Sequence, residues 1–159
     1  MSEHSVVEQM LDEHIRGGNY SSPRRSGPTI VCLCGSTRFY EAFQEANYRE
    51  TLQGKIVLSV GFYPHAQREM HARDVGCTPE QKKALDELHL RKIDLADEVL
   101  VLNVGGYIGE STRREIAYTV SVGKTQGLRF LHEKAGDEYL QNHAHEMAQL
   151  VAEFMSARG

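Results

Sequence analysis

A carboxylate and two hydroxyls follow an apolar run within residues 99–116, and their types and spacing are suited to chemistry on a bound anion. Several glycines separate this run from Ser111, Thr112 and Glu115, so we expect a strand, then a turn, then a helix. Ligands bind at the carboxyl edge of the strands in an open α/β sheet, and a helix N-terminus favours anions. Glu115 is therefore either a catalytic carboxylate or half of a capping box whose N-cap is Thr112.

A second polar turn, Gly-Ser-Thr-Arg at residues 35–38, joins an apolar strand to a helix. Gly35 allows the backbone to turn tightly beside a ligand. Ser36 and Thr37 offer hydroxyls, and Arg38 offers a guanidinium for phosphate oxygens. A cation at a helix N-terminus is unfavourable unless an anion lies nearby, which favours an anion site over a simple helix cap. The turn has neither the Walker A pattern nor the glycine pattern of dinucleotide sites.

Strands and helices are expected to alternate along most of the chain, and they position these two turns. The alternation predicts an α/β fold with a parallel sheet and helices on its faces. We expect residues 1–28 to be an arm and linker, because residues 17–28 are rich in Gly, Ser and Pro, and residues 29–159 to be the domain proper. The expected strands are 29–34, 55–60, 98–103 and 128–131, and the expected helices are 38–53, 78–96, 112–123 and one from about 137.

The composition is that of an ordinary globular domain, with 40% hydrophobic and 25% charged residues. A net charge of −4 argues against a partner that is a nucleic-acid polymer, since phosphate neutralisation needs clustered Lys and Arg. The sequence has neither a membrane-length apolar run nor the pattern of a signal peptide, so we expect a cytoplasmic protein without a membrane partner. Three cysteines do not form a disulfide framework, and we interpret Cys32 and Cys34 as small core residues.

Four features together resemble the nucleoside 2-deoxyribosyltransferase superfamily, and most closely its nucleoside 5′-monophosphate N-glycosidase branch. They are Cys-Gly-Ser-Thr-Arg at 34–38, Ala-Asp-Glu-Val-Leu-Val at 96–101, the Gly-rich turn, and Glu-Ile-Ala-Tyr at 115–118. The likeness spans residues 29–131. It implies a flavodoxin-like three-layer sandwich with a parallel sheet of four to five strands. It also implies that Glu115 attacks an anomeric carbon to form a ribosyl-enzyme intermediate, which water or a second base resolves.

The resemblance also assigns roles to the surrounding residues. The turn at 35–38 is expected to hold a 5′-phosphate through Gly35, Ser36 and Arg38, with Thr37 beside them and Ser111 nearby. Two positions that carry aspartate in the family are His89 and Gly109 here. His89 is expected to protonate a leaving base, held charged by Asp86 one helical turn earlier. The alternative for His89 is a partly buried histidine among leucines.

The long segment 61–78 has no clear periodicity, which is typical of a lid or a disordered loop. Tyr63 and His65 are expected to shape the base pocket. His65, His71 and Cys77 match no common zinc spacing, so no metal is expected.

The sequence therefore predicts an enzyme that cleaves the N-glycosidic bond of a nucleoside or nucleoside 5′-monophosphate, by hydrolysis or by transfer. No cofactor is expected, and the resemblance implies a homo-oligomer, of which a dimer is the simplest. Residues 105–115 also form a stretched relative of the Gly-Gly-x-Gly-Thr-x-x-Glu loop of phosphoribohydrolases. A different class of function is a nucleotide-binding sensor that keeps the fold without turnover, and a third alternative is a structural protein in which Glu115 is only a cap.

Overall fold

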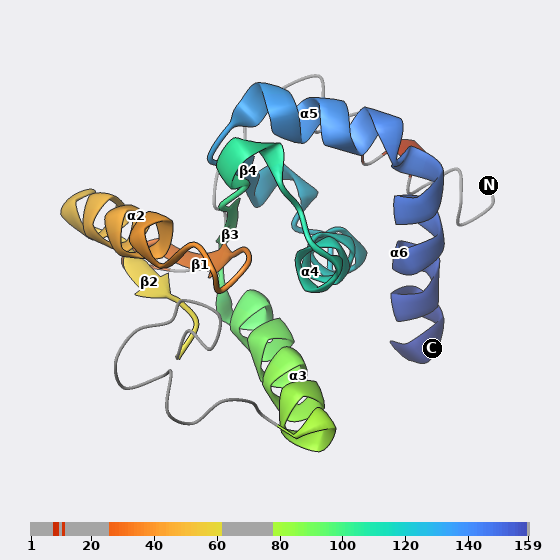
Figure 1. Ribbon diagram of the computed structural model, residues 1–159, viewed down its shortest axis with the longest axis horizontal. Helices are drawn as coiled ribbons and strands as arrows, with labels where there is room; N and C mark the ends of the chain where they lie inside the picture. The colour runs from red at the N-terminus through yellow and green to blue at the C-terminus, as the bar shows by residue number, and fades with distance from the viewer. Residues whose placement is uncertain (1–7, 10, 12–25, 62–77, 159) are drawn as a thin grey trace.

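The computed structural model describes residues 8, 9, 11, 26–61 and 78–158 (Figure 1). Within these ranges four strands form one sheet in the order β2-β1-β3-β4, and every pairing is parallel. Short 3₁₀ turns precede α4 and β4. The elements are β1 (Ile30–Cys34), α2 (Tyr40–Leu52), β2 (Ile56–Leu58), α3 (Pro79–Leu95), β3 (Glu98–Val101), η1 (Val104–Gly106), α4 (Glu110–Ser121), η2 (Thr125–Gly127), β4 (Leu128–Phe130), α5 (Glu133–Asn142) and α6 (Ala144–Arg158).

Helices cover both faces of the sheet, which confirms the predicted α/β flavodoxin-like fold. In Figure 1, α2 lies on one side of the sheet, α4 lies on the other, and α6 packs beyond α4. Alternate strand residues point to opposite faces, so Val31 and Leu33 pack with Phe43 of α2, whereas Cys32 and Cys34 face the other layer. That second layer contains α3, α4 and α6.

From β1 the chain continues to β2 on one side of it, and β3 lies on its other side. The direction of the strand order therefore reverses between β1 and β3. The two strands end level with each other, since Cys34 pairs with Val101. A parallel sheet of this order binds ligands at the carboxyl ends of those two strands. Both turns singled out in the sequence, after β1 and after β3, therefore begin at this edge.

The C-terminal part corrects the prediction of one final helix. The chain forms α5 from Glu133, then turns at His143 into α6. Gly136 allows α5 to pack on β4, because a Cβ there would lie 2.2 Å from Cγ of Phe130. The turn at His143 directs Met147 and Val151 of α6 into the core beside α4. Tertiary packing, rather than a Gly or Pro signal, sets this break.

A network of four charges ties α2 to β3, β4 and the residue before β2, and no sequence pattern predicts it. Glu50 of α2 is 0% exposed and accepts a hydrogen bond of 2.8 Å from Arg129 of β4. Its other oxygen lies 2.8 Å from Nζ of Lys55, and Lys55 and Arg129 both donate to Glu98 of β3. Burial alone would raise the pKa of Glu50, but the hydrogen bonds from Arg129 and Lys55 outweigh it and lower that pKa.

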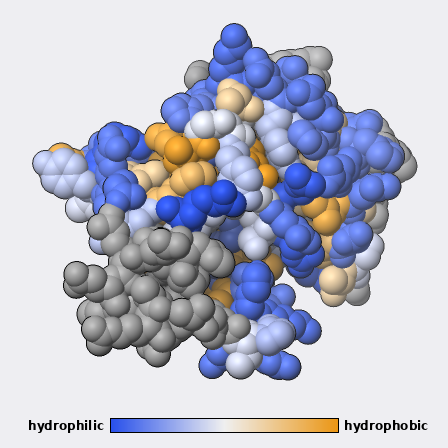
Figure 2. All heavy atoms as spheres, in the orientation of Figure 1, coloured by the Kyte–Doolittle hydropathy of each residue, from blue (hydrophilic) through white to orange (hydrophobic). Residues whose placement is uncertain are grey.

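The surface is mainly hydrophilic on the face drawn in Figure 2, with hydrophobic atoms visible between α2 and β4 and beside α6. Leu11 from the expected N-terminal arm is 1% exposed and belongs to the core cluster that contains Cys34 and Ile116. The arm therefore contributes a side chain to the core. None of the helices in the described ranges is both long and apolar enough to cross a bilayer.

Candidate functional site

The turn after β1 lies against the end of β3. A Cβ at Gly35 would lie 3.2 Å from Cβ of Leu102 and 3.3 Å from its carbonyl oxygen. A larger residue would therefore push β1 away from β3, and glycine permits the close approach. Ser36 and Thr37 follow in the turn and are half-buried, and Arg38 is exposed.

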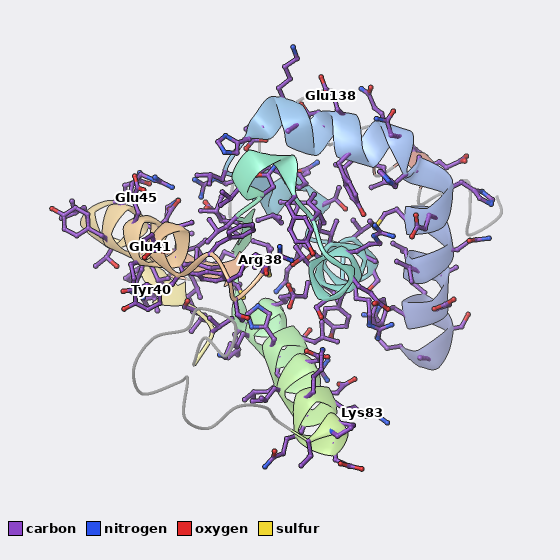
Figure 3. The ribbon with its side chains drawn as sticks, in the orientation of Figure 1. Arg38, Tyr40, Glu41, Glu45, Lys83 and Glu138 are labelled. Atoms are coloured by element: carbon purple, nitrogen blue, oxygen red, sulfur yellow. The ribbon has the colours of Figure 1, made fainter. Side chains whose placement is uncertain are left out.

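Arg38 joins this turn to the loop after β3 through Tyr107. Its Nη2 donates a hydrogen bond of 2.8 Å to the Tyr107 hydroxyl, and its Cζ lies 4.2 Å from the centroid of that ring. Its Nε donates to Oγ of Ser36 at 3.1 Å. In the view of Figure 3, Arg38 lies between α2 and α4. Tyr107, 44% exposed, is a site residue that the sequence analysis did not single out.

Gly109 has a steric role in the same loop. A Cβ at this position would lie 3.1 Å from the hydroxyl oxygen of Tyr107 and 3.3 Å from its ring. The absence of a side chain lets the Tyr107 ring lie over the backbone directly before α4. Arg38 and Gly109 thus contact Tyr107, and Ser36 is linked to it through Arg38, so three predicted site residues are brought together here.

The interpretation of Glu115 as a helix cap is wrong. Helix α4 begins at Glu110, two residues before the expected start, and its N-cap is Gly109, which provides no side-chain cap. Thr112 is 3% exposed inside the first turn and is not an N-cap. Glu115 therefore lies in the second turn, beyond the backbone N–H groups that a capping side chain satisfies.

Glu115 and His89, the two predicted catalytic residues, face each other across α4 and α3. Oε1 of Glu115 lies 3.8 Å from Nε2 of His89, and the side chains are 14% and 8% exposed. Among the described residues, the buried Oε2 of Glu115 has no hydrogen-bond partner. Burial raises the pKa of Glu115 to about 7, although the charge of His89 acts in the opposite direction. Burial would lower the pKa of His89, but a hydrogen bond with Cys32 and the charge of Glu115 raise it.

Two thiols lie behind this pair, and here the structure adds to the interpretation of Cys32 and Cys34 as core residues. Both are fully buried and neither forms a disulfide. Nε2 of His89 lies 3.4 Å from Sγ of Cys34 and 3.7 Å from Sγ of Cys32. The hydrogen bond between the thiols, together with His89, lowers the pKa of Cys32 to about 6. The same hydrogen bond and burial raise the pKa of Cys34. Their alternation on one strand face was the only sequence signal for this cluster.

A cavity of about 310 Å³ lies between α3 and α4, and Glu115 is at its wall. Ser111, another predicted residue, lines it and accepts a long hydrogen bond of 3.4 Å from Nζ of Lys82. Within the described ranges, the turn at 35–38 does not line this cavity. The lining residues are Pro79, Lys82, Lys83, Asp86, Glu87, Leu90, Ser111, Arg114 and Glu115.

Two charge pairs differ from the sequence-based expectation. Asp86 lies 2.7 Å from Nζ of Lys82 rather than holding His89. Arg113 is a cation in the first turn of α4, a place that favours a nearby anion, and it forms an ion pair with Glu146 of α6. Glu146 therefore supplies the negative charge beside Arg113. Of the two neighbouring arginines, Arg114 lines the cavity and Arg113 does not.

Tyr118 is buried and has a structural role between the helices. Its hydroxyl donates to Oδ1 of Asp94 at 2.6 Å and accepts from Arg91, and its ring packs edge-on against Phe154. It therefore ties α4 to α3 and α6. Tyr63 and His65 lie outside the described residues, as do the other members of the segment 62–77.

The described site thus has two parts: a carboxylate at the wall of a cavity with a buried imidazole 3.8 Å behind it, and an arginine-bearing turn that contacts the loop before the carboxylate helix. The first part supplies a nucleophile and a proton donor, and the second supplies donors for an anion. Comparisons of the chain with protein-family models, with curated proteins and with solved structures give no match.

Proposed function

We propose that this protein cleaves the N-glycosidic bond of a nucleoside or a nucleoside 5′-monophosphate, by hydrolysis or by transfer to another base. The observation that carries the proposal is the position of Glu115. Its carboxylate is largely buried, lies at the wall of a cavity of about 310 Å³ and is 3.8 Å from the imidazole of His89. A carboxylate beside a proton donor is the pair that glycosidic bond cleavage requires.

In the proposed reaction, a carboxylate oxygen of Glu115 forms a bond to the anomeric carbon while the bond from that carbon to the base nitrogen breaks. The electron pair of the broken bond goes to the base, and the proton on Nε2 of His89 neutralises it. Water or a second base then attacks the anomeric carbon, His89 takes up the proton that this nucleophile loses, and Glu115 is released as a carboxylate. Water gives the free sugar and hydrolysis, and a second base gives a new nucleoside and transfer.

The donors around the site support a substrate that carries a phosphate. Arg38 is held toward the loop before α4 by Tyr107 and Ser36, so its guanidinium is oriented before any ligand binds. Lys82 and Arg114 add positive charge at the cavity. A 5′-phosphate on the turn at 35–38 would take over the hydrogen bond that Arg38 now gives to Tyr107.

The resemblance to the nucleoside 2-deoxyribosyltransferase superfamily supports the finer parts of the proposal. These are a free nucleoside or nucleotide as the small-molecule substrate, a homodimer, a cytoplasmic location and no cofactor. The phosphoribohydrolase reaction, which cleaves the same type of bond, is the variant in which water alone is the acceptor.

The proposal is tested by incubating the protein with a panel of ribo- and deoxyribonucleosides and their 5′-monophosphates, with and without an added free base. Chromatography then measures released base and any new nucleoside. We expect base release from at least one 5′-monophosphate. Tight binding without release from any member, even with an acceptor base, would contradict catalysis and assign the protein to the sensor class.

A further inference from the structure

A cluster of thiol and imidazole groups lies behind the cavity, where the proposed reaction uses only His89. Cys32 and Cys34 come from β1, and His89 comes from α3. The two sulfur atoms and a ring nitrogen of His89 all lie within 4.8 Å of one another, and all three residues are buried. Glu115 of α4 approaches the same nitrogen of His89 to 3.8 Å.

The distances from Nε2 of His89 to the two sulfur atoms are those of neighbouring ligands in a tetrahedral metal site. Metal–sulfur and metal–nitrogen bonds of about 2.3 and 2.0–2.1 Å place the donors of a tetrahedron about 3.4–3.8 Å apart. Nε2 of His89 lies 3.4 Å from Sγ of Cys34 and 3.7 Å from Sγ of Cys32. The third separation, to Oε1 of Glu115, is 3.8 Å. The two sulfur atoms and the ring nitrogen, all within 4.8 Å of one another, therefore lie close enough to share one ion, and Glu115 approaches the same nitrogen.

The cluster places two thiols, an imidazole and a carboxylate together in the core. Cys32 and Cys34 are 0% exposed on a central strand, where Val and Leu fill the equivalent positions on the other face. The buried Oε2 of Glu115 has no hydrogen-bond partner in the described part of the chain. Buried polar groups are normally paired, and a cation among them would supply the missing partner.

We propose that Cys32, Cys34 and His89 bind a divalent transition metal, with zinc as the best fit, and that Glu115 faces the fourth position. Thiolate and imidazole donors select zinc and similar ions over Mg²⁺ and Ca²⁺, which prefer oxygen. Binding needs both thiolates and a neutral His89, so the protons that these three groups carry go to solvent, and the two thiolates balance the charge of the ion. The evidence for this metal site does not rest on the proposed function, although metal binding and the proposed reaction both use His89.

Metal binding and base release are expected to exclude each other. The metal takes the lone pair of Nε2 of His89, which is the nitrogen that faces both Glu115 and the thiols. A metal-bound His89 cannot deliver a proton to a leaving base. The metal-bound protein is therefore expected to be silent in base release, and the metal-free protein is the form in which that reaction is measured.

The test is a titration of the full chain, first stripped with a chelator, with Co²⁺ and then with Zn²⁺. We expect one equivalent of Co²⁺ to give a thiolate-to-metal absorption band and the strong visible bands of a tetrahedral site. Zn²⁺ should then displace the Co²⁺ and remove the colour. Removal of a group that only hydrogen-bonds to a metal ligand costs about 10- to 100-fold in metal affinity. Loss of a ligand itself should cost more, so Cys32→Val, Cys34→Val and His89→Gln should each weaken binding by more than about 100-fold.

Cys77→Ser is the matched control, since it removes the third cysteine of the chain, which is not one of the proposed ligands. It should bind Co²⁺ like the wild type. The proposal is overturned if the folded wild-type protein gives no thiolate band, or if the band persists when Cys32 and Cys34 are both replaced by valine. Circular dichroism establishes that each variant is folded. Because this readout is metal absorption and not base release, its failure leaves the proposed reaction intact, and the reverse also holds.

Discussion

Replacement of Arg38 by alanine should weaken the binding of a nucleoside 5′-monophosphate far more than that of the matching nucleoside. The guanidinium is exposed and already held by Ser36 and Tyr107, with contacts of 3.1 and 2.8 Å. A charge-assisted hydrogen bond to phosphate contributes about 1.5–3 kcal/mol, which corresponds to about 10- to 150-fold in affinity. Because Arg38 must release the Tyr107 hydroxyl to bind the phosphate, we expect the lower part of that range, about 10- to 40-fold.

Isothermal titration calorimetry with a monophosphate and its nucleoside measures both affinities. Arg38→Lys keeps the charge but loses the planar fork, so an intermediate loss is expected. Arg49→Ala is the control, because Arg49 is also a surface arginine, on α2, whose nearest acidic partner is Glu45 at 3.9 Å. Equal losses for monophosphate and nucleoside in Arg38→Ala would refute the assignment of the phosphate to this turn.

Three further predictions concern the scaffold. Glu50→Gln should lower the free energy of unfolding at pH 7 by about 1.5–3 kcal/mol, since it removes a charged acceptor from Arg129. The pKa of Glu50 is lowered in the folded protein. Its contribution to stability is therefore complete at a pH above its unfolded pKa and is lost as the pH falls through its folded pKa. Denaturant melts between pH 7 and 3 should show a smaller loss of stability in the variant, and identical losses would contradict this. Gly136→Ala should lower the free energy of unfolding by about 1–3 kcal/mol, because the added methyl group meets the Phe130 ring. Gly61→Ala is the control and should be near neutral, since its methyl group meets no atom of the described residues within 4 Å. Thr78→Ala should cost about 1 kcal/mol by removing the N-cap of α3, and an unchanged midpoint would contradict its capping role.

The sheet and most of the helices followed from the sequence because their signals are local. Each strand is an apolar run, and Thr78 with Pro79 marks the start of α3 as predicted. The start of α4 was placed two residues late because Thr112 and Glu115 match a capping box in sequence. Gly109 begins the helix instead, since Tyr107 lies over its backbone, and no local pattern records that contact.

The site was predictable in part for the same reason. Glu115 and His89 were identified from motif positions, and the structure brings them together. The thiols behind them were not assigned a role, because the cluster joins residues 32 and 34 to residue 89 through tertiary packing. Asp86 pairs with Lys82, and Arg113 pairs with Glu146. Spacing along the chain does not show which of several nearby charges a side chain will choose as its partner.

The most direct test of the central claim is the rate of base release by metal-free Glu115→Gln under single-turnover conditions. Glutamine keeps the shape of the side chain but removes the charge that attacks the anomeric carbon, so the rate should fall by about 10³-fold or more while ligand affinity changes little. Glu110→Gln, an exposed residue at the start of the same helix, is the matched control and should keep the wild-type rate. If Glu115→Gln releases base at near the wild-type rate, Glu115 is not the nucleophile and the proposed reaction is wrong.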